Sequence, residues 1–132
     1  MVIDTSALIA ILLDEPEREA FERAIEADPL RLLSAVGKFE AGMVVAGRLD
    51  VAGLSRLDRL LNACAVTVVP FTDHHAAIAR DAFIRYGKGR HPAGLNFGDC
   101  ASYALAIAEA EPLLFKGTDF GATDVRVVGE GK

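Results

Sequence analysis

The sequence predicts an α/β fold in which helices cover both faces of a parallel sheet. Short apolar segments typical of buried strands alternate with longer segments of helical pattern. No sequence signal of a tight hairpin occurs between neighbouring strands. The helical segments between them are long enough to be the crossover connections that parallel strands need. With 132 residues, of which 52% are hydrophobic, the chain is long enough to bury a core without disulfides. We therefore expect a single domain over residues 1–132.

The first half of the chain is predicted to hold two strands and four helices. Residues 1–4 are apolar up to Asp4, which indicates a short buried strand, and residues 6–13 have a helical pattern. Residues 15–28 are predicted to be a helix because Pro16 stands in its first turn and acidic residues come early. The remaining elements of this half are a strand at 30–34 and helices at 35–48 and 53–64.

The second half is predicted to add three strands and two helices. Residues 66–70 are β-branched and end at a proline, which is typical of a strand. Thr72 or Asp73 can cap the next helix, which runs to about Tyr86, and the Gly- and Pro-rich residues 87–98 form a loop. The last elements are a buried alanine-rich helix at 99–110 and strands at 112–115 and 125–128.

Charge and hydropathy argue against two broad classes of protein. The formal net charge is -5 and the pI is about 5.1, which argues against a general electrostatic nucleic-acid binder. Any nucleic-acid role must therefore depend on a local basic patch or on metal ions. No apolar stretch reaches the roughly 18 residues that span a bilayer, and none resembles an export signal. We expect a cytoplasmic protein with no membrane association.

Three acidic residues follow strands or open a helix at one edge of the predicted sheet. Asp4 ends the first strand, Asp119 follows the strand at 112–115, and Asp99 opens the buried helix. Because ligands bind at the carboxyl ends of parallel strands, we expect these carboxylates to converge. Taken singly, Asp4 and Asp99 are also good helix caps, and Asp119 suits a turn.

A fourth acid, Glu40, lies within an apolar face of the helix at 35–48. Burying a carboxylate there is unfavourable unless something satisfies it, although the side chain can also reach the edge of the face. Several carboxylates in one place repel each other unless a cation neutralises them, and oxygen ligands suit magnesium or manganese. Such ions polarise a phosphoryl oxygen and activate a water, which is the chemistry of phosphodiester hydrolysis. The other members of that face are Val36, Phe39, Met43, Val44 and Gly47.

The loop before Asp99 carries cations. Lys88, Arg90 and His91 stand in the segment GKGRHPAGLNFGDC, and such side chains can hold phosphates. The alternative is an ordinary solvated surface loop. Lys116, after the strand at 112–115, can meet a carboxylate or a phosphate, or remain solvated.

Four segments together resemble PIN-domain ribonucleases, and in particular VapC toxins of type II toxin–antitoxin systems. They are MVIDTSALIAIL, the stretch from Ser34 to Glu40, GKGRHPAGLNFGDC and LLFKGTDF. The resemblance runs over essentially the whole chain and implies a three-layer α/β/α fold and a magnesium- or manganese-dependent endoribonuclease. It also implies a homodimer inhibited by a VapB-type antitoxin. One departure is Ala101, where similar proteins often have an aromatic residue.

The resemblance assigns roles to individual residues. Asp4 and Asp99 would be the main metal ligands, Glu40 would complete the site or orient its water, and Asp119 would be the fourth acid. Thr5 and Ser6 match hydroxyl positions beside the cluster. Together with the loop residues Lys88, Arg90 and His91, they are the RNA contacts that we expect.

Two other functions remain open from the residues. A phosphorylated signalling domain would also use acids, magnesium and a late lysine, but residues 1–4 offer only one acid where such domains usually have a pair. A binding module without turnover would suit the acidic pI and the apolar helices.

Overall fold

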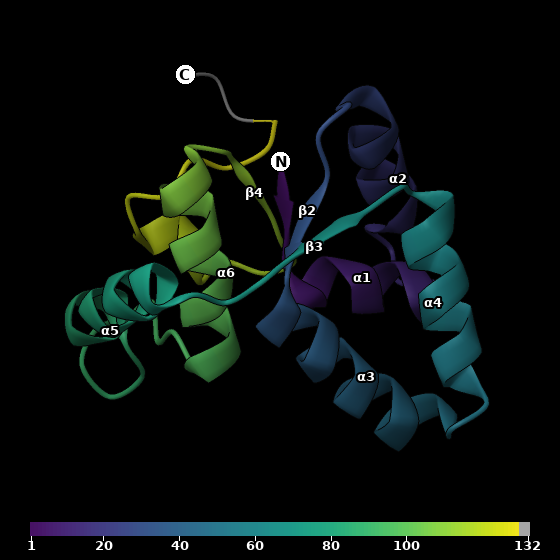
Figure 1. The fold of residues 1–132 in the computed structure, drawn as a ribbon, viewed down its shortest axis with the longest axis horizontal. Coiled ribbons are helices and arrows are strands. Elements are labelled where there is room, and N and C mark those ends of the chain that lie inside the picture. The colour runs from purple at the N-terminus through teal and green to yellow at the C-terminus, as the bar shows by residue number, and fades with distance from the viewer. Residues whose placement is uncertain (130–132) are drawn as a thin grey trace.

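The computed structural model describes residues 1–129 and has a four-stranded parallel sheet at its centre (Figure 1). The strands lie in the order β3-β2-β1-β4, and each neighbouring pair is parallel. Their bounds are β1 Val2–Ile3, β2 Leu32–Ser34, β3 Thr67–Val69 and β4 Leu113–Leu114.

Helices cover the two faces of this sheet unequally. Figure 1 shows α1 to α4 on one side of the strands and α5 and α6 on the other. The three-layer α/β/α fold expected from the sequence is therefore confirmed. The helices are α1 Thr5–Leu12, α2 Arg18–Ala27, α3 Ala35–Leu49, α4 Gly53–Ala63, α5 Asp73–Tyr86 and α6 Phe97–Glu109.

Strand residues divide between two hydrophobic cores according to the alternation of side chains along a strand. In β1, Val2 packs in the core under α5 and α6, whereas Ile3 packs in the core under α1 to α4. The neighbouring strands divide in the same way, with Leu32 and Leu113 in the first core and Leu33 and Leu114 in the second. Burial on both faces explains why these strands are apolar without interruption.

The strand order reverses beside β1. Strands β1, β2 and β3 follow each other outward in one direction, and β4 then pairs with the opposite edge of β1. In open parallel sheets such a reversal opens a crevice at the carboxyl ends of the strands, and ligands bind there. Asp4, which directly follows β1, stands at this point, and its backbone N–H donates to the carbonyl of Leu114 at 2.9 Å.

Some boundaries and one strand differ from the sequence prediction. The segment 125–128 forms no strand and contributes one isolated bridge, between Val127 and Leu113, because the chain passes the sheet only briefly there. The helix predicted at 99–110 begins at Phe97, and a short 3-10 helix follows Asp119, at Phe120–Ala122. None of the helices in residues 1–129 is long and apolar enough to cross a membrane.

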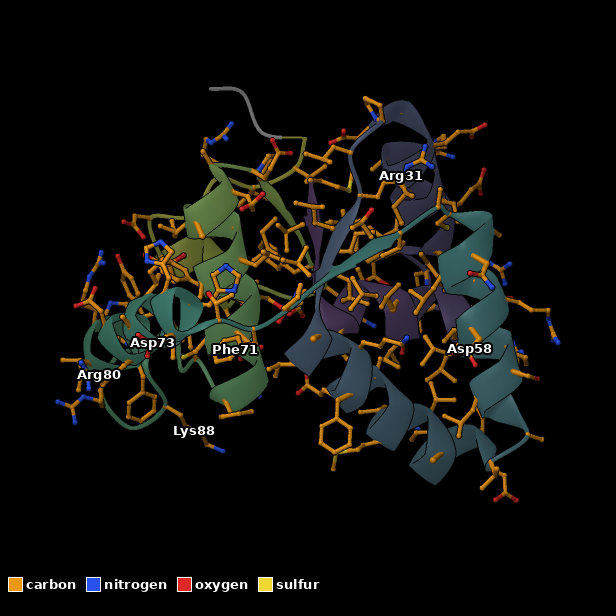
Figure 2. All side chains as sticks on the ribbon, viewed as in Figure 1. Arg31, Asp58, Phe71, Asp73, Arg80 and Lys88 are labelled. Atoms are coloured by element: carbon orange, nitrogen blue, oxygen red, sulfur yellow. The ribbon has the colours of Figure 1, made fainter. Side chains whose placement is uncertain are left out.

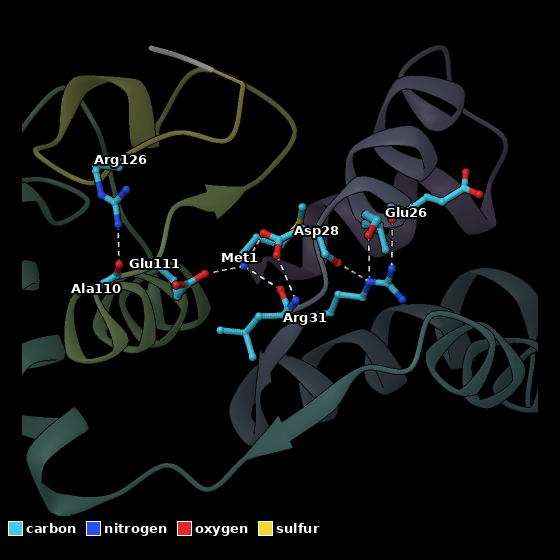
Figure 3. A network of polar contacts seen from close by, with 9 residues as sticks. Met1, Glu26, Asp28, Arg31, Ala110, Glu111 and Arg126 are labelled. Carbon is cyan, nitrogen blue, oxygen red and sulfur yellow. Dashed lines mark hydrogen bonds and ion pairs between the residues drawn. The ribbon is translucent and has the colours of Figure 1, made fainter. Parts of the chain in front are cut away.

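The amino ends of the strands hold a network of paired charges (Figure 3). The amino group of Met1 donates to Asp28 at 2.8 Å, to Glu111 at 2.6 Å and to the carbonyl of Leu30 at 2.7 Å. The guanidinium of Arg31 donates to three backbone carbonyls at the end of α2 and to one directly after α4, and thereby ties these helix ends to β2. The carbonyls belong to Ile25, Glu26, Asp28 and Cys64.

Candidate active site

Asp4 is buried, with 3% of its surface exposed, and hydrogen bonds hold both oxygens of its carboxylate. It caps α1, and its Oδ2 accepts from the backbone N–H of Ser6 at 3.0 Å and from the Ser6 hydroxyl at 2.6 Å. Its Oδ1 accepts from the hydroxyl of Ser102 at 2.6 Å, which reaches across from α6. The capping role considered from the sequence is therefore real, but it uses only Oδ2.

Asp99 stands in the first turn of α6 and is not its cap. Asn96 is the N-cap: its side chain accepts from the Asp99 N–H at 2.9 Å, and the Asp99 carboxylate accepts from the Asn96 N–H at 3.0 Å. This reciprocal pair forms a capping box and starts the helix two residues before the position predicted from the sequence. The pKa of the Asp99 carboxyl is raised to about 6, mainly by burial and to a smaller extent by the carboxylates of Asp4, Glu40 and Asp119, whereas the hydrogen bond from the Asn96 N–H lowers it.

Glu40 lies against the start of α6. A side chain in place of Gly98 would overlap with the Glu40 carboxylate, so the two segments approach closely and position 98 has no room for another residue. Burial raises the pKa of the Glu40 carboxyl, the Thr5 hydroxyl beside it lowers the pKa, and the Asp4 carboxylate raises it. Glu40 therefore joins the same group of acids, from α3.

The apolar face of α3 that surrounds Glu40 is not the buried face. Phe39 and Met43 are exposed by 71% and 61%, and the face that packs in the core consists of Gly37, Ala41 and Val45. The expectation that Glu40 sits in a typical buried stripe was therefore wrong, because small residues and not bulky ones pack against α1. Glu40 lies between the two faces and is half-buried.

Asp119 is the most exposed of the four acids. It precedes the 3-10 helix Phe120–Ala122, and its side chain caps nothing there. It is nevertheless close enough to raise the pKa of Asp99. Asp4, Glu40 and Asp119 thus all lie close enough to Asp99 to raise its pKa, and their roles as metal ligands stay a prediction.

No lysine or arginine of residues 1–129 pairs with these four acids. The nearby candidate, Lys116, instead forms ion pairs with Glu15 at 3.0 Å and Glu17 at 3.6 Å, on the connection between α1 and α2. The acids therefore repel each other without compensation. As they stand, no three Asp, Glu, His or Cys side chains of the described chain are close enough to hold a metal ion.

The predicted cations lie on the loop between α5 and α6. Figure 2 shows Lys88 reaching away from this loop into solvent. Arg90 is exposed, and its Nε donates to the carbonyl of Ile84 at 3.2 Å. The half-buried His91 packs edge-on against Tyr86, and its Nδ1 accepts from the Ala93 N–H at 3.0 Å. These contacts order the loop and leave the charges of Lys88 and Arg90 exposed.

The hydroxyls of Thr5 and Ser6, which were expected to contact RNA, form hydrogen bonds inside the protein. Thr5 is buried and donates to the Gly37 carbonyl at 3.0 Å, which ties α1 to α3. Ser6 donates to Asp4, and its hydroxyl accepts from the Lys116 N–H at 3.0 Å, which ties α1 to β4. Ser102 makes the third such link and was missed from the sequence, since a serine in an alanine-rich helix carries no signal of its partner.

Comparison with known proteins identifies a family and close relatives of this chain. The PIN domain family matches residues 1–126. Ribonuclease VapC30 of Mycobacterium tuberculosis is 51% identical over 128 residues, which are 97% of this chain and 98% of the relative.

Two solved structures under 20% identical share the fold. VapC20 of M. tuberculosis, described as a sarcin–ricin loop cleaving toxin, has a TM-score of 0.77 at 16% identity and covers 94% of this chain and 95% of its own. VapBC2 of Rickettsia felis, bound to a DNA fragment from its promoter, has a TM-score of 0.76 at 14% identity. The match covers 96% of this chain and 94% of the VapBC2 chain. Given the family match and the identity to VapC30, the chain belongs to the PIN-domain family and, within it, to the VapC ribonucleases.

Proposed function

We propose that this protein is a magnesium-dependent endoribonuclease, with manganese as a substitute, and the toxin of a VapBC pair. One observation carries the proposal: four acids from the end of β1, α3, α6 and the segment after β4 lie near the reversal of strand order, and no cation of residues 1–129 pairs with them. A group of carboxylates in that position needs a cation to be stable when ionised. The all-oxygen donor set fits a hard divalent ion.

The acids divide the work of holding that ion. Asp4 and Asp99 are the main ligands, since they are the most constrained; Glu40 completes the site, and Asp119 stands at its open side. When bound, a magnesium ion polarises a phosphoryl oxygen and lowers the pKa of a water that it coordinates.

The exposed loop supplies RNA contacts that the acidic surface lacks. Lys88 and Arg90 are exposed and hold the phosphates on either side of the scissile bond, and His91 positions the loop between them. This local patch accounts for RNA binding by a chain of net charge -5. Thr5 and Ser6 contribute by fixing the acids.

The same proposal includes two protein partners. The VapBC2 complex of R. felis, which has this fold, supports an antitoxin of the VapB type. The exposed Phe39 and Met43 on α3, with the exposed Phe97 at the start of α6, give an apolar surface beside the acids that suits a homodimer. We place this activity in the cytoplasm, where both RNA and a newly made antitoxin are found.

The test is RNA cleavage by the purified, antitoxin-free protein. Total bacterial RNA is incubated with the protein in magnesium, in manganese and in EDTA, and new 5′ ends are mapped. We expect discrete cuts in either metal and none in EDTA, and an Asp99→Asn variant with the same circular dichroism spectrum should make none. Cuts that persist in EDTA would contradict metal dependence.

A binding module without turnover makes a different prediction. It would associate with the antitoxin and leave RNA intact in every metal, including purified ribosomal and transfer RNA tested separately. That result, from a folded protein, would favour the binding module.

A further inference from the structure

Asp4 does not offer its two carboxylate oxygens equally to a ligand. An ionised carboxylate has about four lone-pair sites, two on each oxygen. Oδ2 accepts two hydrogen bonds, both from Ser6, and is therefore saturated. Oδ1 accepts one, from Ser102, and keeps one lone pair free. A cation that Asp4 binds must therefore bind through Oδ1.

The hydrogen bond from Ser102 orients the remaining lone pair of Oδ1. Its hydroxyl is 1% exposed, lies 2.6 Å from Oδ1, and forms one hydrogen bond within the described chain, to Asp4. Such a short bond to a carboxylate is charge-assisted and directional. A hydroxyl buried in an otherwise apolar stretch of α6 is unfavourable without a partner.

The position of Ser102 on α6 also links two of the acids. Asp99 and Ser102 are three residues apart and so lie on one side of the helix. The Ser102 hydroxyl thus joins β1 to the helix that carries Asp99, across 98 positions of sequence. It fixes Asp4 both in orientation and relative to Asp99.

We propose that Ser102 is a positioning residue that holds Asp4 for binding of the divalent cation through Oδ1, an inference that rests on the proposed function. Residues that orient metal ligands in this way typically change metal affinity by about 10–100-fold when they are removed. Removing the Ser102 hydroxyl leaves the Asp4 carboxylate held by Ser6 alone and cuts its link to α6, so Oδ1 is no longer fixed relative to Asp99 and affinity should fall.

The experiment measures binding of Mn²⁺ alone, by isothermal titration calorimetry, to the antitoxin-free protein and its variants. We expect Ser102→Ala to bind Mn²⁺ about tenfold more weakly than the parent. The matched control is Ser34→Ala, which removes another buried serine hydroxyl, the cap of α3 that accepts from the Val36 N–H. That variant should be less stable to urea and should bind Mn²⁺ as the parent does.

Ser102→Cys provides a second route if the alanine variant does not fold. The thiol is of similar size and is a weak donor, so we expect the same loss of affinity. Binding by either folded variant within twofold of the parent, or more tightly, overturns the role of Ser102 and leaves the metal site intact. A parent protein that binds no Mn²⁺ overturns both the proposed metal site and this inference.

Discussion

The two edges of the sheet treat charge in opposite ways. At the amino ends of the strands, the Met1 amino group is paired with Asp28 and Glu111, and Arg31 is held by backbone carbonyls. At the carboxyl ends, four acids face each other, and no cation of the described residues pairs with them. The comparison shows that one fold can pair its charges at one edge and, among the described residues, leave the acids of the other edge without a cationic partner.

The largest effect should come from removing one charge at the acidic edge. We expect Asp4→Asn to slow RNA cleavage about 1,000-fold, equivalent to ~4 kcal/mol of transition-state stabilisation, because the buried ligand loses its charge. The measurement is the single-turnover rate on one mapped RNA site. Glu111→Gln is the matched control at the opposite edge, and equal losses in both variants would show that the two edges do not differ.

Metal binding should stabilise the protein through the acidic edge alone. At a concentration about 100 times its dissociation constant, Mn²⁺ should raise the free energy of unfolding by ~2.7 kcal/mol, measured by urea unfolding with EDTA as reference. Asp99→Asn should abolish most of this gain because it removes a main ligand. A full gain in that variant would locate the metal elsewhere.

The paired edge should matter for stability and not for metal. Arg31→Ala leaves several partly buried carbonyls without their donor, so we expect the free energy of unfolding to fall by about 2 kcal/mol. Mn²⁺ affinity, measured by calorimetry, should stay within twofold of the parent. Weaker Mn²⁺ binding by this variant would mean that the two edges are coupled.

The acidic edge should also make the metal-free protein more stable in mild acid. The folded-state pKa of Asp99 is raised from 3.8 to about 6, so the folded state binds the proton more tightly than the unfolded state does. The ionised Asp99 carboxylate therefore lowers the free energy of unfolding. This loss of stability is complete above pH 6 and disappears as the pH falls toward 4.

After allowance for solvent screening, this pH effect should amount to about 1 kcal/mol. Asp99→Asn should remove that part of the pH dependence and stabilise the metal-free protein at pH 7. The measurement is urea unfolding in EDTA from pH 4 to 7. Identical pH profiles for parent and variant would contradict the raised pKa.

The smallest expected effect concerns the exposed cations. A plot of the logarithm of the RNA binding constant against the logarithm of the salt concentration has a negative slope. Replacing Lys88 and Arg90 with alanine should make this slope shallower by about 1.4, because two phosphate contacts are lost. The slope is measured by binding of a single-stranded RNA to the Asp99→Asn protein, which should not cleave it, with and without the two alanine substitutions. An unchanged slope would exclude the loop from the RNA interface.

The sequence predicted the place of an acidic residue wherever that place followed from the end of a strand or the start of a helix. Asp4, Asp99 and Asp119 could be placed at one edge because strand ends and the loop before α6 are visible in the pattern of residues. Glu40 was found because an acid among apolar residues is unusual. Its neighbours were misread, since hydropathy does not reveal that α3 packs through Gly37 and Ala41 and leaves Phe39 outside.

What sequence reasoning missed depends on contacts between distant segments. The Ser102–Asp4 bond joins positions 98 apart, and nothing local to Ser102 indicates it. His75 is buried and takes part in the capping box of α5 with Thr72, a contact that sequence reasoning did not find. The strand predicted at 125–128 is apolar enough, but it meets β4 at one bridge only.

The pairing of β4 with β1 has a consequence for how the protein is made. Asp4 is synthesised before the residues of β4, which lie more than 100 positions later in the chain. Until β4 docks, the edge of β1 is open, Ser6 has no Lys116 N–H to accept from, and Asp119 does not yet exist. A chain that ends before β4 therefore has three of the four acids and an open sheet edge, so the group of acids is complete only once the last segment has been made.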